Sequence, residues 1–133
     1  MYENAYDFMR QIDERELLRI HVKAASKGKI HRGTGIRNRP RFLQSIKDLH
    51  NAADAERDLL DIIVGIFDDI ERNPQPFNDC NHRTAMALGR ILAKQFGFRL
   101  SYSEKEGERL RARWEEMSRD DLKVWVRRHL FAL

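Results

Sequence analysis

Two amphipathic helical patterns, separated by a short polar stretch, constrain the fold of this chain more than any other feature. Apolar residues recur at intervals of three and four, first within residues 52–73 and again after Asp79 as far as Gly97. This spacing places apolar side chains on one face of an α-helix, so each pattern predicts a helix with one buried side. The positions expected to be buried are Leu59, Ile62, Ile63, Ile66, Phe67, Ile70, Ala85, Leu88, Ile91, Leu92 and Phe96.

The rest of the chain also reads as helical. Asp13 can cap a helix that Gly28 would end, and Pro40 can open a short helix over residues 40–50. A last pair of helices is expected over residues 103–117 and 118–133, the second beginning with a Ser118–Asp121 capping box. Residues 29–41 contain glycine, proline and several basic side chains, which predicts a loop or short hairpin. The fold class expected is therefore all-α.

Length and composition predict one domain covering residues 1–133. The chain is 41% hydrophobic and 35% charged, which is typical of a folded and well-solvated protein. Its net charge of +4 could attract nucleic acid, nucleotide phosphates or an acidic partner. Acidic and basic residues are interleaved along the helices, however, so we do not expect nucleic-acid binding as its main role. No membrane partner is expected. Cys80 is the only cysteine, and the N-terminal residues lack the apolar run of a secretion signal, so we expect a cytoplasmic protein.

The polar stretch at residues 73–83 concentrates the side chains that could carry chemistry. The first turn of a helix has backbone N–H groups without partners and a partial positive charge, and therefore binds phosphate readily. Arg83 adds a fork of donors that matches phosphate oxygens, and Asp79 supplies a carboxylate suited to Mg²⁺. Asn81 can accept from the next amides or donate to phosphate. Phe77 should anchor the loop in the core. The simpler alternative is a helix with an ordinary Asp79 or Asn81 cap and a solvated Arg83.

The residues "QPFNDCNHRTA" resemble the signature of the Fic/Doc family, H-x-F-x-[D/E]-x-N-[G/K]-R, and lie between two long helices as in that family. The likeness extends to the first helix, to "GTGIRNRPRFLQSI", which is similar to the family's flap and following helix, and to the closing helix. The closest resemblance is to Doc (death-on-curing) toxins. It implies a compact Fic-fold bundle of about six helices with a short flap near residues 30–40.

The resemblance also implies an activity. Family members transfer part of a nucleotide to a protein hydroxyl; most transfer AMP, whereas Doc-type toxins transfer a phosphate to a threonine of a translation factor and are neutralised by an antitoxin. Here it implies ATP or another NTP and Mg as cofactors, with Asp79 on Mg²⁺ and Asn81 and Arg83 on phosphates. The backbone amides of Cys80, Asn81, His82 and Arg83 would form the anion-binding turn. The flap Gly33–Arg39 would align the target's serine or threonine segment.

Three positions depart from the signature. Gln75 stands where the family has the general-base His, and a neutral amide cannot accept a proton, which lowers the expected rate by about 10²- to 10⁴-fold. His82 stands where AMP-transferring members have Gly and Doc-type members have Lys. Its side chain crowds the approach of a nucleotide's inner phosphates and favours the Doc-like arrangement. Cys80 is interpreted as a tolerated small residue rather than a catalytic thiol.

Three functions are consistent with these residues. The first is a Doc-like transferase that moves a phosphate, or less readily AMP, to a Ser or Thr of a translation-related protein. The second is an inactive module of the same fold that binds a nucleotide or a partner chain, because Gln75 replaces the base. The third, a basic nucleic-acid binder, explains the charge but not the polar stretch.

Overall fold

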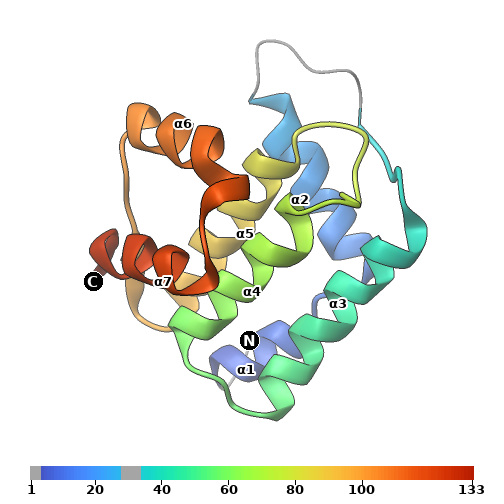
Figure 1. The fold of residues 1–133 in the computed structure, drawn as a ribbon. Coiled ribbons are helices and arrows are strands. Elements are labelled where there is room, and N and C mark those ends of the chain that lie inside the picture. Colours follow the sequence, from blue (N-terminus) through green and yellow to red (C-terminus); the bar gives the residue numbers. More distant parts are fainter. Residues whose placement is uncertain (1–3, 28–33) are drawn as a thin grey trace.

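The two helices that flank the polar stretch form the centre of the molecule. The computed structural model describes residues 4–27 and 34–133. Within it, α4 (Leu59–Glu71) and α5 (Asn81–Gln95) pack against each other more extensively than any other pair of elements. Figure 1 shows them side by side in the middle of the bundle, in green and yellow, with the other helices around them. The polar stretch is the loop that joins them.

The surrounding elements cover these two helices from several sides. The helix α2 packs on α5, whereas α3 and α7 pack on α4, and α1 packs on α3. The remaining elements are α1 (Ala5–Arg10), α2 (Glu14–Ser26), α3 (Arg39–Asp54), β1 (Phe98–Leu100), α6 (Glu104–Arg113), the 3-10 turn η1 (Trp114–Glu116), α7 (Arg119–Arg128) and β2 (Leu130–Ala132). The described residues are mostly helical and contain seven α-helices, so the all-α prediction is confirmed.

The core lies where α4 meets α3, α5 and α7. The helix α4 has buried residues around most of its circumference, which fits its strongly apolar sequence. Its Phe67 is fully buried and meets Trp114 edge to face, with 5.8 Å between the ring centroids. Leu92 of α5 and Leu122 of α7 are also fully buried. The loop between α4 and α5 is therefore held by two helices that are themselves fixed in the core.

The predicted boundaries of two helices are wrong. We expected helices over residues 40–50 and 52–73, but α3 continues to Asp54 and α4 begins only at Leu59. Between them Glu56 adopts a left-handed conformation (φ 49°), and Asp58 caps α4 by accepting from the Asp61 amide. The segment in between has neither glycine nor proline, and its one local signal for the break is Asp58, a residue type that caps helices.

The C-terminal residues also differ from expectation. The predicted helix over residues 118–133 ends at Arg128, although its Ser118–Asp121 capping box is confirmed. Residues 130–132 instead form β2, which pairs antiparallel with β1 in the register Phe98↔Ala132. This short pairing joins the end of the chain to the turn after α5. Gly28, the expected end of α2, lies outside the described residues.

None of the helices in the described part of the chain is both long enough and apolar enough to cross a membrane.

Candidate phosphate-binding site at the start of α5

The loop between α4 and α5 is anchored in the core by Phe77, as predicted. The side chain is fully buried. Its ring stacks on His21 of α2 with 3.9 Å between centroids, and meets Phe42 of α3 edge to face at 5.7 Å. One aromatic residue therefore ties the loop to two neighbouring helices, which limits how far the polar residues on either side of it can move.

A buried histidine also holds this loop in place, through hydrogen bonds. His21 is fully buried, with Nδ1 2.9 Å from Thr84 Oγ1 and Nε2 accepting from the Gly35 amide at 3.3 Å. Because Nε2 accepts, Nδ1 carries the proton and donates to Thr84. The Thr84 hydroxyl in turn donates to the Cys80 carbonyl at 2.8 Å. His21 thus connects the start of α5 to the segment before α3.

The described part of the flap lies against this loop. The amide of Arg37 donates to the Pro76 carbonyl at 2.8 Å, and the amide of Asn78 donates to the Gly35 carbonyl at 3.0 Å. Gly33 lies outside the described residues, and Arg39 is the first residue of α3 rather than part of the flap. One backbone edge of residues 35–38 is therefore used to hold the loop. Docking of a target segment on the flap stays a prediction.

Among the described residues, no side chain caps the first turn of α5. Its N-cap residue Cys80 adopts a left-handed conformation (φ 59°, ψ 28°) and offers no side-chain cap. Within residues 4–27 and 34–133, no group accepts a hydrogen bond from the amides of Asn81, His82 or Arg83. Free amides at a helix N-terminus favour an anion. The Cys80 amide, also predicted to bind phosphate, instead donates to Asp79 Oδ1 at 2.8 Å.

The side chain of Asn81 is engaged with the loop rather than directed at a ligand. It is buried; Oδ1 accepts from the Phe77 amide at 3.0 Å and Nδ2 donates to the Phe77 carbonyl at 3.1 Å. The same Nδ2 lies 3.3 Å from Gln75 Oε1, and Gln75 Nε2 donates to the Glu71 carbonyl at 3.0 Å. Asn81 can thus offer an anion its backbone amide, while Gln75 is held in place at both ends of its side chain.

Asp79 and Arg83 line one cavity of about 450 Å³ beside the loop, which we call the loop cavity. Arg83 is exposed and Asp79 is half-buried. Arg111, which belongs to α6, also lines this cavity. The alternative in which Asp79 caps the helix does not hold, because Cys80 is the N-cap and has no side-chain cap. Burial and the nearby Asp79 charge raise the pKa of the Cys80 thiol, against the partial effect of Arg83 and Arg111, which disfavours a thiolate nucleophile.

His82 is paired with a buried carboxylate. Its Nδ1 lies 2.8 Å from Oε2 of Glu71, the last residue of α4, and the two side chains are only 18% and 5% exposed. His82 lines the loop cavity and also a second cavity, of about 570 Å³. The imidazole therefore stands between the two cavities, with a fixed orientation.

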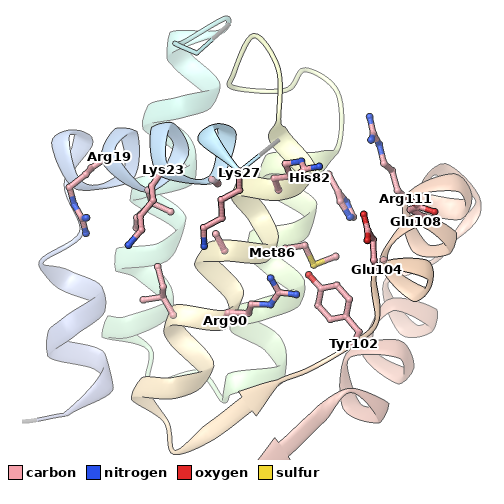
Figure 2. A pocket seen from close by; sticks show the side chains of 16 residues that line it. Arg19, Lys23, Lys27, His82, Met86, Arg90, Tyr102, Glu104, Glu108 and Arg111 are labelled. Carbon is pink, nitrogen blue, oxygen red and sulfur yellow. The ribbon is translucent and has the colours of Figure 1, made fainter. Parts of the chain in front are cut away.

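The second cavity, which we call the cationic cavity, lies between α2, α5 and α6. Figure 2 shows Arg19, Lys23 and Lys27 in a row along α2, facing Met86 and Arg90 of α5. Tyr102 and the helix α6 close its other side. The Arg90 guanidinium lies 4.5 Å from the centroid of the Tyr102 ring, and burial raises the pKa of Tyr102 to about 12. Its lining combines an apolar floor with a strongly basic rim, and it shares His82, Arg83 and Arg111 with the loop cavity.

The residues present suit a magnesium–phosphate group by their chemistry. Magnesium is commonly held by one or two carboxylates together with phosphate oxygens rather than by a full protein cage. Asp79 supplies one carboxylate in the loop cavity, next to the free amides of α5. In the described parts of the chain, no group of three or more His, Cys, Asp or Glu residues could hold a metal ion by itself. Any divalent ion here would therefore depend on ligands from a bound nucleotide.

Sequence reasoning missed Glu71 and Arg111. Glu71 lies at the end of an apolar helix, and Arg111 is one of several arginines in the charged helix α6. Their place in the site depends on how α4, α6 and the loop pack together, which no local pattern encodes. Glu71 stands in the sequence among the charged residues Asp68, Asp69 and Arg72, so no local signal distinguishes it.

Comparisons of the chain with protein-family models, with curated proteins and with solved structures find no match.

Proposed function

We propose that the chain is an NTP-dependent transferase that modifies a protein hydroxyl at the start of α5. In the form closest to the Doc toxins that the sequence resembles, it moves a phosphate, or less readily AMP, to a Ser or Thr of a translation-related protein. The observation that carries this proposal is the uncapped first turn of α5, with Asp79 and Arg83 lining the cavity beside it. An antitoxin chain is the partner expected from the same resemblance.

Each polar residue of the loop cavity would have its own role in binding the nucleotide. The amides of residues 81–83 and the Arg83 guanidinium would bind phosphate oxygens, since both donate and both carry positive charge. Asp79 would hold Mg²⁺, which neutralises phosphate charge when bound together with a nucleotide. Arg111 lies where it can contribute a further positive charge. Positioning and charge neutralisation account for most of the catalysis in phosphoryl transfer.

A second candidate is an inactive module of the same fold that binds a nucleotide or partner but transfers nothing. Gln75 favours it, because a neutral amide replaces the expected base and both ends of its side chain are hydrogen-bonded. The binding chemistry of the cavity is the same in both candidates. They differ only in whether another group accepts the proton of the attacking hydroxyl.

One experiment separates the two candidates. The protein is incubated with Mg²⁺, a cell lysate and ATP labelled either at the γ- or at the α-phosphate, and binding of Mg·ATP is measured separately by calorimetry. Label from γ-ATP on a lysate protein supports phosphate transfer, and label from α-ATP supports AMP transfer. Binding without transfer supports the inactive module. Absence of nucleotide binding contradicts the transferase and the nucleotide-binding form of the inactive module.

The binding part can be tested with matched arginine variants. We expect Arg83→Ala to weaken Mg·ATP binding by about 10-fold or more, because a charge-assisted contact to phosphate contributes roughly 1.5–3 kcal/mol. Arg113→Ala is the control: this residue is exposed at the end of α6 and lines neither cavity. Equal affinities of the two variants would contradict the proposed role of Arg83.

A further inference from the structure

The transfer proposed above needs a proton acceptor, and the residue at the position of the family's base cannot act as one. Gln75 is a neutral amide, and both ends of its side chain are hydrogen-bonded. We propose that His82 is the general base of this site and that Glu71 is its positioning residue. This inference rests on the proposed function, and it assigns the proton transfer to a position where the family signature has no base.

The contact between Glu71 and His82 fixes which nitrogen can accept a proton. A carboxylate oxygen only accepts hydrogen bonds, so Nδ1, 2.8 Å from Glu71 Oε2, carries the ring proton. The neutral ring then has its lone pair on Nε2. Among the described residues, no hydrogen bond is made to Nε2. Because His82 lines both cavities, we expect Nε2 to be accessible from them.

The Glu71–His82 pair is buried, which fixes its geometry and strengthens the interaction between its members. The Glu71 side chain is 5% exposed, and its position at the end of α4 is fixed by a helix embedded in the core. A buried carboxylate that accepts from Nδ1–H holds an imidazole in one tautomer and stabilises the positive charge that forms when Nε2 takes up a proton. The same arrangement on a solvated face would be mobile and screened.

The position of His82 also suits the reaction. It is the second residue of α5 and lies between Asn81 and Arg83, whose amides belong to the same uncapped turn. A phosphate held by that turn would therefore lie next to the imidazole, and Figure 2 shows His82 at the end of the cationic cavity between Lys27 and Arg111. His82 lines both of the cavities through which a target hydroxyl could reach that phosphate.

The proposed step balances without another reactant. The hydroxyl oxygen of the target forms a bond to the γ-phosphorus, and the bond from that phosphorus to the bridging oxygen breaks. The electron pair leaves with the nucleoside diphosphate. The hydroxyl proton moves to Nε2 of His82, which becomes an imidazolium paired with Glu71, and it is later released to solvent. Transfer of AMP would use the same proton path, with pyrophosphate as the leaving group.

The first test needs no nucleotide and no activity. Imidazole ¹⁵N NMR of the isolated protein distinguishes the two neutral tautomers, and His82→Gln identifies the His82 signals by their loss. We expect the Nδ1–H tautomer for His82 in the wild-type protein, and a shift toward Nε2–H in Glu71→Gln. His82→Lys provides a second assignment if His82→Gln does not fold. A wild-type His82 with its proton on Nε2 would overturn the inference.

The second test measures transfer of γ-label and Mg·ATP affinity side by side. We expect His82→Gln to lower the transfer rate by about 10²- to 10⁴-fold with little change in affinity, since a general base acts on the chemical step. Imidazole added to His82→Gly should restore part of the rate. Glu71→Gln should lower kcat by at least about 10-fold with KM unchanged. His50→Gln is the control, because His50 lines neither cavity and bonds to the Ile12 carbonyl.

The outcomes separate this inference from the proposed function. Label transfer that persists in His82→Gln at the wild-type rate overturns the role of His82 and leaves the transferase intact. A wild-type protein that binds Mg·ATP but transfers nothing has no working base; the inference then fails and the inactive module stands. A protein that binds no nucleotide contradicts the proposed function and the inference together. Imidazole rescue of His82→Gly, together with a wild-type rate in His50→Gln, supports the inference.

Discussion

Asn81 illustrates how a single side chain can define the shape of a binding loop. Its amide group forms hydrogen bonds to both backbone groups of Phe77 and to the side chain of Gln75. The bonds to Phe77 imitate a backbone pairing across the turn, so the loop keeps its form without regular secondary structure. Because these bonds occupy the amide group, the Asn81 side chain is not available to bind a phosphate.

We expect Asn81→Ala to lower the free energy of unfolding by about 2–3 kcal/mol. The variant leaves the buried Phe77 amide without its acceptor, and an unsatisfied buried polar group costs about 1–3 kcal/mol in addition to the lost bonds. Urea denaturation followed by circular dichroism measures the change. Asn51→Ala, an exposed substitution in α3, is the control and should change stability by less than about 0.5 kcal/mol. Similar effects of the two substitutions would show that the Asn81 bonds contribute little.

At this scale the sequence predicts which residue types meet, but not how each side chain is used. Asp79 and Arg83 lie next to the same helix start, so their shared cavity follows from local spacing alone. The direction of the Asn81 side chain depends on the path of residues 75–77, where the Pro76 carbonyl accepts from the amide of the distant Arg37. Glu71 meets His82 only because α4 and α5 pack antiparallel and close together, and no short-range pattern contains that information.

The interface between α3 and α4 contains a carboxylate pair. Asp69 of α4 is half-buried and interacts with Asp48 of α3, and burial followed by this contact raises the pKa of Asp69 to about 7. Gln44 donates to Asp48 at 2.7 Å, and Arg41 bonds to the Asp69 carbonyl rather than to its carboxylate. A proton shared by the two carboxylates thus helps to join the helices.

This pair predicts a stability that falls as the pH rises. The folded protein keeps the Asp69 proton from about pH 4 to pH 7, where the unfolded chain has lost it, so the stabilisation is full below pH 4 and is lost as the pH rises through 7. Asp69→Asn keeps a hydrogen-bond donor toward Asp48 at every pH. We expect the variant to become more stable than the wild type by about 1–2 kcal/mol at pH 8, after allowing for solvent screening.

Urea denaturation of both proteins between pH 4 and pH 8 measures this difference. It should be small at pH 4 and should increase toward pH 8. Asp120→Asn is the control, because Asp120 is exposed on α7 and its substitution should give a difference that changes little between pH 5 and pH 8. A constant difference between Asp69→Asn and the wild type would show that the two carboxylates do not share a proton.

At the scale of elements the sequence predicts the helices well and their ends less well. Apolar spacing identifies α4 and α5, and capping residues correctly identify the starts of α2 and α7. The break at residues 55–58 has only one local signal, the capping residue type of Asp58, because the rest of "AERD" is compatible with a helix. The strand β2 was missed for a different reason: residues 130–132 become a strand only because β1, thirty residues earlier, offers an edge.

At the scale of the whole molecule, positive charge is concentrated around the cationic cavity, whose lining has more basic than acidic residues, although the net charge is only +4. Arg19 pairs with Glu16, and Arg90 lies over Tyr102. Within the described residues, Lys23 and Lys27 of the cationic cavity and the shared Arg83 and Arg111 form no ion pair. Composition could not predict this, since it depends on three helices that bring their basic residues to one place.

This distribution predicts that the cationic cavity attracts the nucleotide electrostatically. Lys23→Glu changes the local charge by two units at the rim, so we expect Mg·ATP affinity to fall by about 3- to 10-fold at low salt. The difference should shrink toward 0.5 M salt, where screening shortens the Debye length to less than about 5 Å. Lys47→Glu makes the same change of net charge on the exposed side of α3, away from both cavities, and serves as the control. If both variants weaken binding equally, the overall charge attracts the nucleotide; a loss confined to Lys23→Glu places the attraction at the cavity.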